Sequence, residues 1–189
     1  MRFATGFLRS LSSVPALANF LGSLYFVYEA IERLSSESTH PAVQKMHFPE
    51  LHRMPPLAKD MEYFFGDEWK SSLVPSEATL AYVSRIEEVA REKPYLLVSH
   101  MFTRYLGDLF GGRMMAPMVR TSLSLPPEAT HFYVFEEVPN PKAFIDTWYT
   151  QLNTLELSEA EQQEMVDEAN RAFRWREQNA SHGPSFAQI

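Results

Sequence analysis

The chain has 189 residues, a formal net charge of −7 and no cysteine, with 45% hydrophobic and 22% charged residues. This length and composition suit one folded domain with a sizeable core and exclude a disordered chain. The negative charge argues against a nucleic-acid-binding protein, which needs a basic face for phosphates. The lack of cysteine excludes disulfides, thiolate metal sites and a cysteine nucleophile.

No transmembrane segment is expected, because the longest apolar run, 17–27, is interrupted by Asn19, Gly22 and Ser23 and falls short of the roughly 20 apolar residues required. The first fifteen residues carry two arginines, several serines and no acid, as organellar transit segments do. An amphipathic helix is the favoured interpretation. Its apolar face would contain Phe3, Phe7, Leu8 and Leu11.

Proline and glycine divide the first half of the chain into helices. Apolar residues at helical spacing predict a helix from Pro15 to about Ser36, and a polar loop follows at 35–41. A shorter helix is predicted over 53–65, where Gly66 would stop it. Ser76 is a candidate N-cap for a third helix that runs to about Glu92.

The second half begins with a long helical segment, 95–124, directly after Pro94. Residues 131–135 are aromatic and β-branched enough for a short strand, although no neighbouring segment would pair with it. Two more helices are predicted over 140–155 and 158–178, the second with a capping box at its start. Short loops join these helices, so we predict one all-α bundle domain over residues 1–189.

Three of the seven glycines lie within six residues of the segment 95–124, at Gly107, Gly111 and Gly112, and Asp108 lies between them. In a helix each glycine costs about 1 kcal/mol relative to alanine, and aspartate is also a poor helix former. Either the helix kinks here, or a flat ligand approaches its backbone. A close helix–helix crossing with an exposed aspartate explains the glycines equally well.

The segment 96–112, LLVSHMFTRYLGDLFGG, resembles the distal helix of biliverdin-forming heme oxygenases. Residues 23–30 (SLYFVYEA), 48–53 (FPELHR) and 166–173 (VDEANRAF) are similar to other parts of the same family. The resemblance covers almost the whole chain. It implies a heme oxygenase-like multi-helix bundle with a glycine-kinked distal helix, in which heme is both substrate and cofactor.

The resemblance also implies roles for individual residues. Gly107, Gly111 and Gly112 would let the helix backbone press against the porphyrin, and Asp108 would organise the waters that deliver protons. The products would be biliverdin, CO and Fe²⁺, with electrons from a separate reductase or ferredoxin. The side chains that match the water-ordering network of the family are Tyr28, Thr103 and Arg104.

The sequence departs from the family pattern at the iron ligand. The ligating histidine of the family would fall before Met1 when counted back from Phe3, so most of the proximal helix is missing from this sequence. None of the six histidines is an obvious substitute, and His100 matches a position that is not the ligand in the family. No metal ligand is therefore assigned.

The heme carboxylates are the second point of departure. The two positions at which the family supplies cations on a late helix are Ile145 and Tyr149 here, and Asp146 adds a negative charge. A charge-assisted hydrogen bond contributes about 1.5–3 kcal/mol, so the absence of these cations would weaken heme binding severely. Phe110 replaces a serine between the glycines, and Phe102 replaces a distal tyrosine.

These departures favour a degenerate, non-catalytic protein that serves as a structural or interaction subunit of a larger assembly, placed in a plastid or mitochondrion by analogy. The alternative is an active heme oxygenase with a longer N-terminus, which the intact run from Gly107 to Gly112 supports. A further alternative is a tetrapyrrole-binding module that needs no iron ligand. Exposed methionines after the glycines, at Met114, Met115 and Met118, would indicate a partner interface, whereas buried ones would belong to the core.

Overall fold

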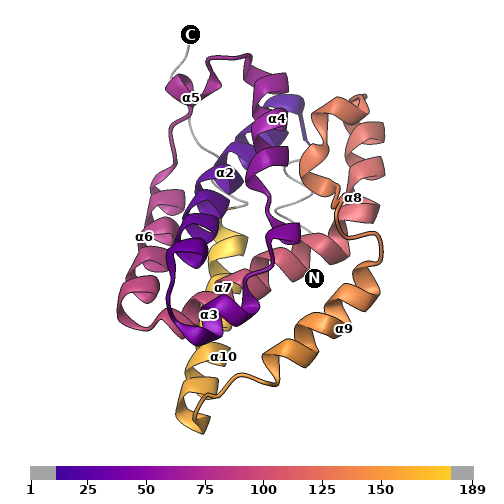
Figure 1. Ribbon diagram of the computed structural model, residues 1–189. Coiled ribbons are helices and arrows are strands. Elements are labelled where there is room, and N and C mark those ends of the chain that lie inside the picture. Colours follow the sequence, from indigo (N-terminus) through magenta and orange to yellow (C-terminus); the bar gives the residue numbers. More distant parts are fainter. Residues whose placement is uncertain (1–11, 180–189) are drawn as a thin grey trace.

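The computed structural model describes residues 12–179, and every regular element within this range is a helix (Figure 1). The expected N-terminal amphipathic helix and His182 lie outside the described residues. The helices are α2 (Val14–Glu37), α3 (Pro41–Met46), η1 (Pro49–Leu51), α4 (Met54–Phe65), α5 (Trp69–Ser72), α6 (Glu77–Glu92), η2 (Pro94–Leu96), α7 (Leu97–Met101), η3 (Phe102–Leu106), α8 (Gly107–Leu123), η4 (Pro127–Ala129), η5 (His131–Tyr133), α9 (Pro141–Leu152) and α10 (Glu159–Asn179).

The predicted helices begin and end at local signals in the sequence. The Ser76 hydroxyl accepts the Thr79 N–H at the start of α6. At the start of α10, Ser158 and Glu161 exchange hydrogen bonds, which confirms the predicted capping box. Gly66 ends α4 with a φ of +74°, a conformation that favours glycine. The short helices α3 and α5 were not predicted, because six and four residues are too few for a periodic pattern.

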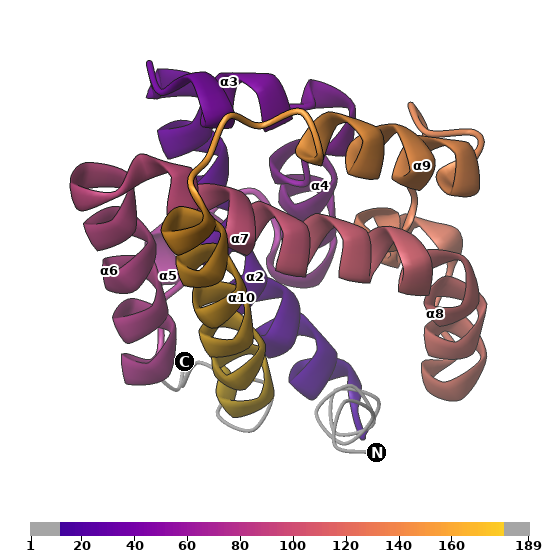
Figure 2. The ribbon, with the colours of Figure 1, turned by 90° about the horizontal axis from the view of Figure 1, so that it is seen from below.

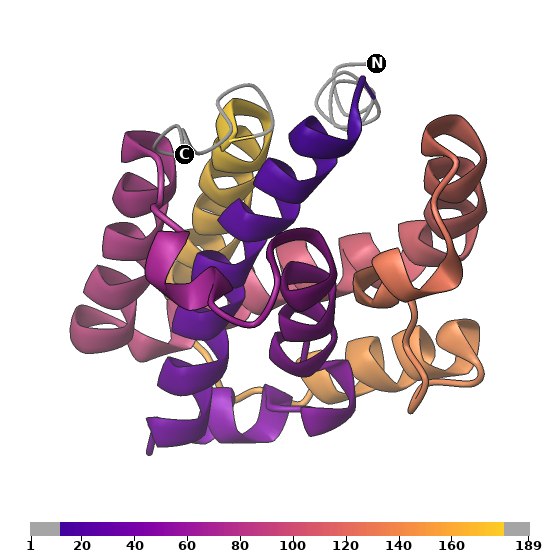
Figure 3. The same cartoon turned by 90° about the horizontal axis from the view of Figure 1, so that it is seen from above.

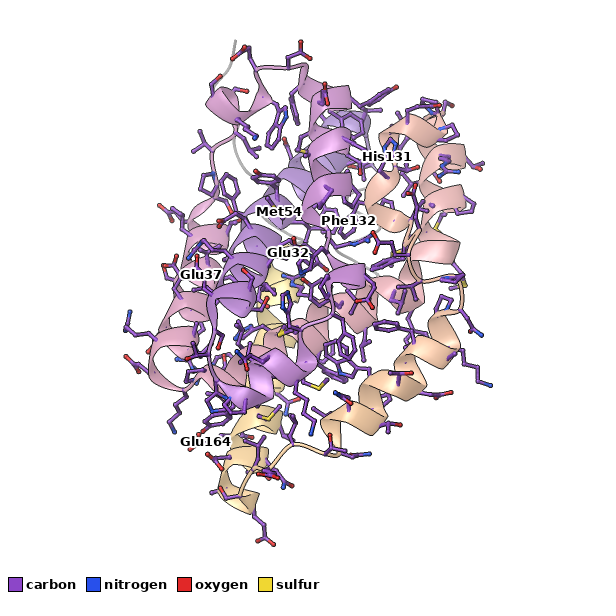
Figure 4. The ribbon with its side chains drawn as sticks, in the orientation of Figure 1. Glu32, Glu37, Met54, His131, Phe132 and Glu164 are labelled. Carbon is purple, nitrogen blue, oxygen red and sulfur yellow. The ribbon has the colours of Figure 1, made fainter. Side chains whose placement is uncertain are left out.

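The predicted strand at 131–135 is wrong. Residues His131–Tyr133 form the single 3₁₀ turn η5, which packs against α4 and α8. The buried Asp60 carboxylate on α4 accepts the backbone N–H groups of His131 and Phe132 at 2.7 and 2.8 Å. A side chain therefore satisfies the donors that a partner strand would otherwise have bonded. Figure 4 shows both labelled residues on the side facing α4.

Helix α2 lies in the middle of the molecule, with α6 and α10 on one side and α4 and α8 on the other (Figure 3). Its contacts are chiefly with α4 and α6. By length and composition alone α2 could cross a membrane. However, 56% of its most apolar 18-residue stretch is buried inside the bundle, as in the core helix of a globular domain. Its fully buried side chains include Leu17, Leu21, Tyr28 and Ile31.

The predicted continuous helix over 95–124 is irregular at its centre. It begins as η2 and α7, passes through the π-helical turn η3, and continues as α8. The π turn immediately precedes Gly107. The irregularity of the helix therefore starts with an altered backbone hydrogen-bond pattern, and the glycines are not its only cause. Figure 2 shows this segment crossing the bundle beside α10 and changing direction along α8, which contains the internal Pro117.

Candidate functional site

A buried pair of polar side chains lies where the π turn meets α8. The Tyr28 hydroxyl, from the centre of α2, donates a hydrogen bond to Asp108 Oδ2. Tyr28 is fully buried and Asp108 is 8% exposed. Burial and the neighbouring Asp108 charge raise the pKa of Tyr28 well above its usual value, so Tyr28 stays protonated and acts as the donor.

Arg104 approaches the same site from the π turn and is also buried. Its guanidinium carbon lies 5.0 Å from the centre of the Tyr82 ring. Burial lowers the pKa of Arg104, but the neighbouring Tyr82, Tyr28 and Asp108 outweigh this effect and raise it, so the guanidinium remains charged. Asp108 therefore accepts a hydrogen bond from a phenol and lies near a buried cation.

Three buried polar atoms at this site have no hydrogen-bond partner among the described residues: Arg104 Nε, Arg104 Nη2 and the Tyr133 hydroxyl. Burial is the main cause of the raised pKa of Tyr133, and the Asp108 charge is the second. The second effect requires the Tyr133 hydroxyl and the Asp108 carboxylate to be near one another. Buried donors without partners are rare in folded proteins, because each costs about 1–3 kcal/mol. Their concentration around Asp108 indicates a place for water or ligand atoms.

The structure separates the three glycines into two kinds. Gly107 and Gly111, four residues apart on one face of α8, are partly exposed, whereas Gly112 is buried. A Cβ added to Gly112 would lie 2.4 Å from the Tyr133 carbonyl oxygen, so Gly112 is required by packing against η5. A Cβ on Gly111 would meet only the flexible end of Met115, at 2.9 Å. Gly107 and Gly111 are therefore the pair available to a ligand.

Of the other predicted site residues, Thr103 is buried in the π turn and donates from Oγ1 to the Ser99 carbonyl at 2.8 Å. Phe110 is 69% exposed and thus fills no part of the core. Met114 and Met118 are also exposed, at 73% and 46%, contrary to the more frequent core location of such residues. Within the part of the chain that the structure describes, this side of α8 is therefore open to solvent.

All five histidines in the described range already have partners. His100 is fully buried, with Nε2 3.1 Å from Glu168 Oε1 and Nδ1 3.2 Å from the Tyr82 hydroxyl. His131 Nδ1 lies 3.1 Å from Asp60, and the remaining three bond within the segment 40–52. Each of the five imidazoles in residues 12–179 is therefore already in contact with another group of the protein.

Helix α9 carries Ile145 and Tyr149, the two positions at which cations were expected to be absent. It borders a pocket of about 370 Å³ between α7, α9 and α10. Tyr149 lines the pocket and packs edge to face against Phe102, with 6.3 Å between the two ring centres. Ile145 is buried one turn earlier on α9. None of the side chains that line the pocket is charged. The unpartnered buried donors around Asp108 suit a ligand on the distal side, whereas the residues that line the pocket beside α9 supply no cation.

Two site residues were not found from the sequence. Tyr82 and Tyr133 come from α6 and η5, and no local pattern distinguishes either of them from an ordinary core tyrosine. Only the tertiary contacts bring them beside Arg104 and Asp108.

The fold and the site together define an all-α bundle protein with a cluster of buried polar side chains on a π-distorted helix. The family profile described as heme oxygenase matches residues 1–179. The chain is 43% identical to heme oxygenase 2 of Rattus norvegicus over 157 residues, which are 81% of this chain and 50% of the rat protein. It is 39% identical to the heme oxygenase of Porphyra purpurea over 173 residues, 90% of this chain and 73% of that protein.

Solved structures agree with these sequence comparisons. Heme oxygenase-1 of Synechocystis sp. PCC 6803, in complex with heme, superposes with a TM-score of 0.89 at 35% identity, over 95% of this chain and 81% of that one. Heme oxygenase-2 of the same organism, in complex with heme and NO, gives 0.90 at 32% identity, over 96% and 76%. The chain belongs to the heme oxygenase family, and it spans about half the length of its mammalian relatives.

Proposed function

We propose that this chain carries the distal half of a working heme oxygenase site, which cleaves heme to biliverdin, CO and Fe²⁺ with electrons from a ferredoxin or reductase. The observation that carries the proposal is the buried set formed by Tyr28, Asp108 and Arg104, with unpartnered donors around it. Burying these groups lowers stability unless each is paired. A scaffold would gain nothing from them, whereas a proton-delivering site requires them.

When bound, heme supplies the iron that activates O₂; the side chains of this chain hold and move protons. Asp108 would accept protons from solvent and pass them to water at the open face of α8, while Tyr28 fixes the orientation of its carboxylate. Arg104 would supply a fixed positive charge near Asp108. Gly107 and Gly111 would leave room for the porphyrin face against the backbone.

A second candidate is a non-catalytic interaction subunit, as the departures from the family pattern favoured. Two observations support it: each imidazole in residues 12–179 already contacts another protein group, and no charged side chain lines the pocket beside α9. The exposed side of α8, with Phe110 and Met114, would then be the partner surface.

One experiment separates these candidates. Heme is titrated into the purified chain with and without free imidazole, and turnover is then followed by absorbance with ferredoxin and its reductase. We expect a Soret shift that saturates at one equivalent of heme and is followed by formation of biliverdin. If the chain supplies no iron ligand, the shift should require free imidazole. Asp108→Ala should retain the Soret shift and lose biliverdin, while the surface control Asp167→Ala should behave as wild type.

No saturable Soret shift, even with imidazole, would overturn the catalytic proposal in favour of the interaction subunit. Saturable binding of heme and biliverdin without turnover would instead indicate a tetrapyrrole-binding module.

A further inference from the structure

A pair of histidines lies in the first connection between long helices, where α3 ends and η1 begins. His47 is the C-cap of α3, and His52 follows η1. Their Nε2 atoms lie 3.0 Å apart, and their ring centres 5.1 Å apart. Both residues are partly exposed, so solvent reaches this pair directly.

The other ring nitrogen of His52 faces a buried carboxylate. His52 Nδ1 lies 3.8 Å from Glu32 Oε2. The second oxygen, Glu32 Oε1, accepts the backbone N–H groups of Arg53 and Met54, and the Tyr105 hydroxyl lies 3.5 Å away from it. Figure 4 shows Glu32 beside Met54 at the centre of the molecule. With Oε1 already engaged, Oε2 is the atom left to orient His52.

This arrangement has the parts of an imidazole metal site. At 3.8 Å the Glu32 carboxylate is beyond hydrogen-bond distance of His52 Nδ1, but its charge favours a proton on that nitrogen and so leaves the Nε2 lone pair directed outward. A carboxylate beside the second ring nitrogen is the usual outer-shell support of a ligating histidine. Two Nε2 atoms about 3 Å apart are close enough to occupy neighbouring positions on one metal at about 2.0–2.1 Å from each. Two neutral imidazoles facing one another can share one N–H···N bond, whereas a divalent cation would accept both lone pairs.

We propose that His47 and His52 bind one divalent transition metal ion of borderline softness, such as Zn²⁺ or Cu²⁺, with Glu32 as the outer-shell carboxylate. Imidazole nitrogen suits these ions, and Cu²⁺ should bind more tightly than Zn²⁺. Within the described residues no group of three or more His, Cys, Asp or Glu side chains surrounds a common point, so water would complete the coordination. This site is independent of the proposed heme chemistry.

The electrostatic surroundings keep both imidazoles neutral at pH 7. Burial lowers the pKa of His47, against the opposing charge of Glu50. Burial also lowers the pKa of His52, helped by His47 and Arg53 and opposed by Glu50. Burial raises the pKa of Glu32 to about 7. Burial thus disfavours the protonated imidazoles that would compete with a metal ion for these nitrogens.

The test is a calorimetric titration of the heme-free 189-residue chain with Zn²⁺, together with the electron paramagnetic resonance spectrum of one equivalent of Cu²⁺. We expect one site of micromolar affinity and a Cu²⁺ spectrum with two nitrogen ligands. His47→Asn and His52→Asn should each lower the affinity at least tenfold, and Glu32→Gln should lower it about tenfold.

His40→Asn is the matched control, since His40 is a nearby, partly exposed histidine whose Nδ1 only caps α3, and asparagine retains that acceptor. Proton resonances of the two imidazoles in the unmodified chain give a readout that needs no variant: Zn²⁺ should shift His47 and His52 alone. Absence of a site, or a site that survives both histidine variants, would overturn the proposal and leave the pair as an imidazole–imidazole hydrogen bond.

Discussion

The glycines of α8 show how two neighbouring residues of the same type have different physical reasons to be present. Gly112 faces the carbonyl of Tyr133, whereas Gly111 faces only the end of Met115. Backbone cannot move aside as a flexible thioether can. The family resemblance implies that all three glycines face the ligand, whereas the residues alone left close packing equally open. The structure assigns Gly112 to packing.

We therefore expect opposite results from two alanine substitutions. Gly112→Ala should destabilise the heme-free protein by about 1–3 kcal/mol through overpacking against η5. Gly111→Ala should leave stability equal or raised by up to about 1 kcal/mol, because alanine is the better helix former. Urea unfolding followed by circular dichroism measures both. If Gly111→Ala is the more destabilising of the two, the assignment of faces is incorrect.

At the scale of elements, α10 is attached to the distal helix by a buried ion cluster. Arg85 on α6 bonds both oxygens of Glu168 at 3.1 and 2.7 Å, and His100 on α7 faces the same carboxylate. Burial raises the pKa of Glu168, but the hydrogen bonds from His100 and Arg85 outweigh it and lower the pKa to about 2. Because Tyr82 joins His100 to Arg104, this cluster also fixes the neighbourhood of the candidate site.

Glu168→Gln should therefore destabilise the protein by about 1–3 kcal/mol, since it removes the buried one of the two carboxylates that bond Arg85 and leaves only Glu88. The double variant with Arg85→Gln should be less destabilised than the sum of the two single variants. Glu92→Gln, in the exposed pair with Arg91, serves as control and should change little. Additive effects in the urea-unfolding cycle would show that the two side chains are not coupled.

At the scale of the whole molecule, the helices share one continuous core. Trp69 on α5 and Trp148 on α9 belong to the same buried cluster although they lie far apart in the sequence. A single core should unfold in one step. This expectation follows from the predicted single domain, which we retain as a proposal.

In each of two variants, one that keeps only Trp69 and one that keeps only Trp148 as the fluorescent tryptophan, the unfolding midpoint in urea from fluorescence should equal the midpoint of that same variant from far-ultraviolet circular dichroism. Separate midpoints from the two signals within one variant would contradict the single domain and divide the bundle between α5 and α9.

The long helices could be predicted from the sequence because their causes are local. The signals that start or stop a helix act within one turn of its end, as at Ser76, Gly66 and the capping box at Ser158. Apolar periodicity then defines the body of each helix. The unusual density of glycine around Asp108 also located the candidate site from the sequence alone. The family resemblance added Tyr28, Thr103 and Arg104 to it.

Only the tertiary structure decided what these residues touch. Tyr28 bonds Asp108 across 80 positions of sequence, and Asp60 satisfies backbone donors that the local pattern assigned to a strand. The pairing of His47 with His52 and Glu32 likewise depends on how α2 packs against the loop before α4. Local rules act over a few residues, whereas burial, unpartnered donors and shared carboxylates arise from the packing of distant segments. That packing decides which polar side chains meet at the candidate site.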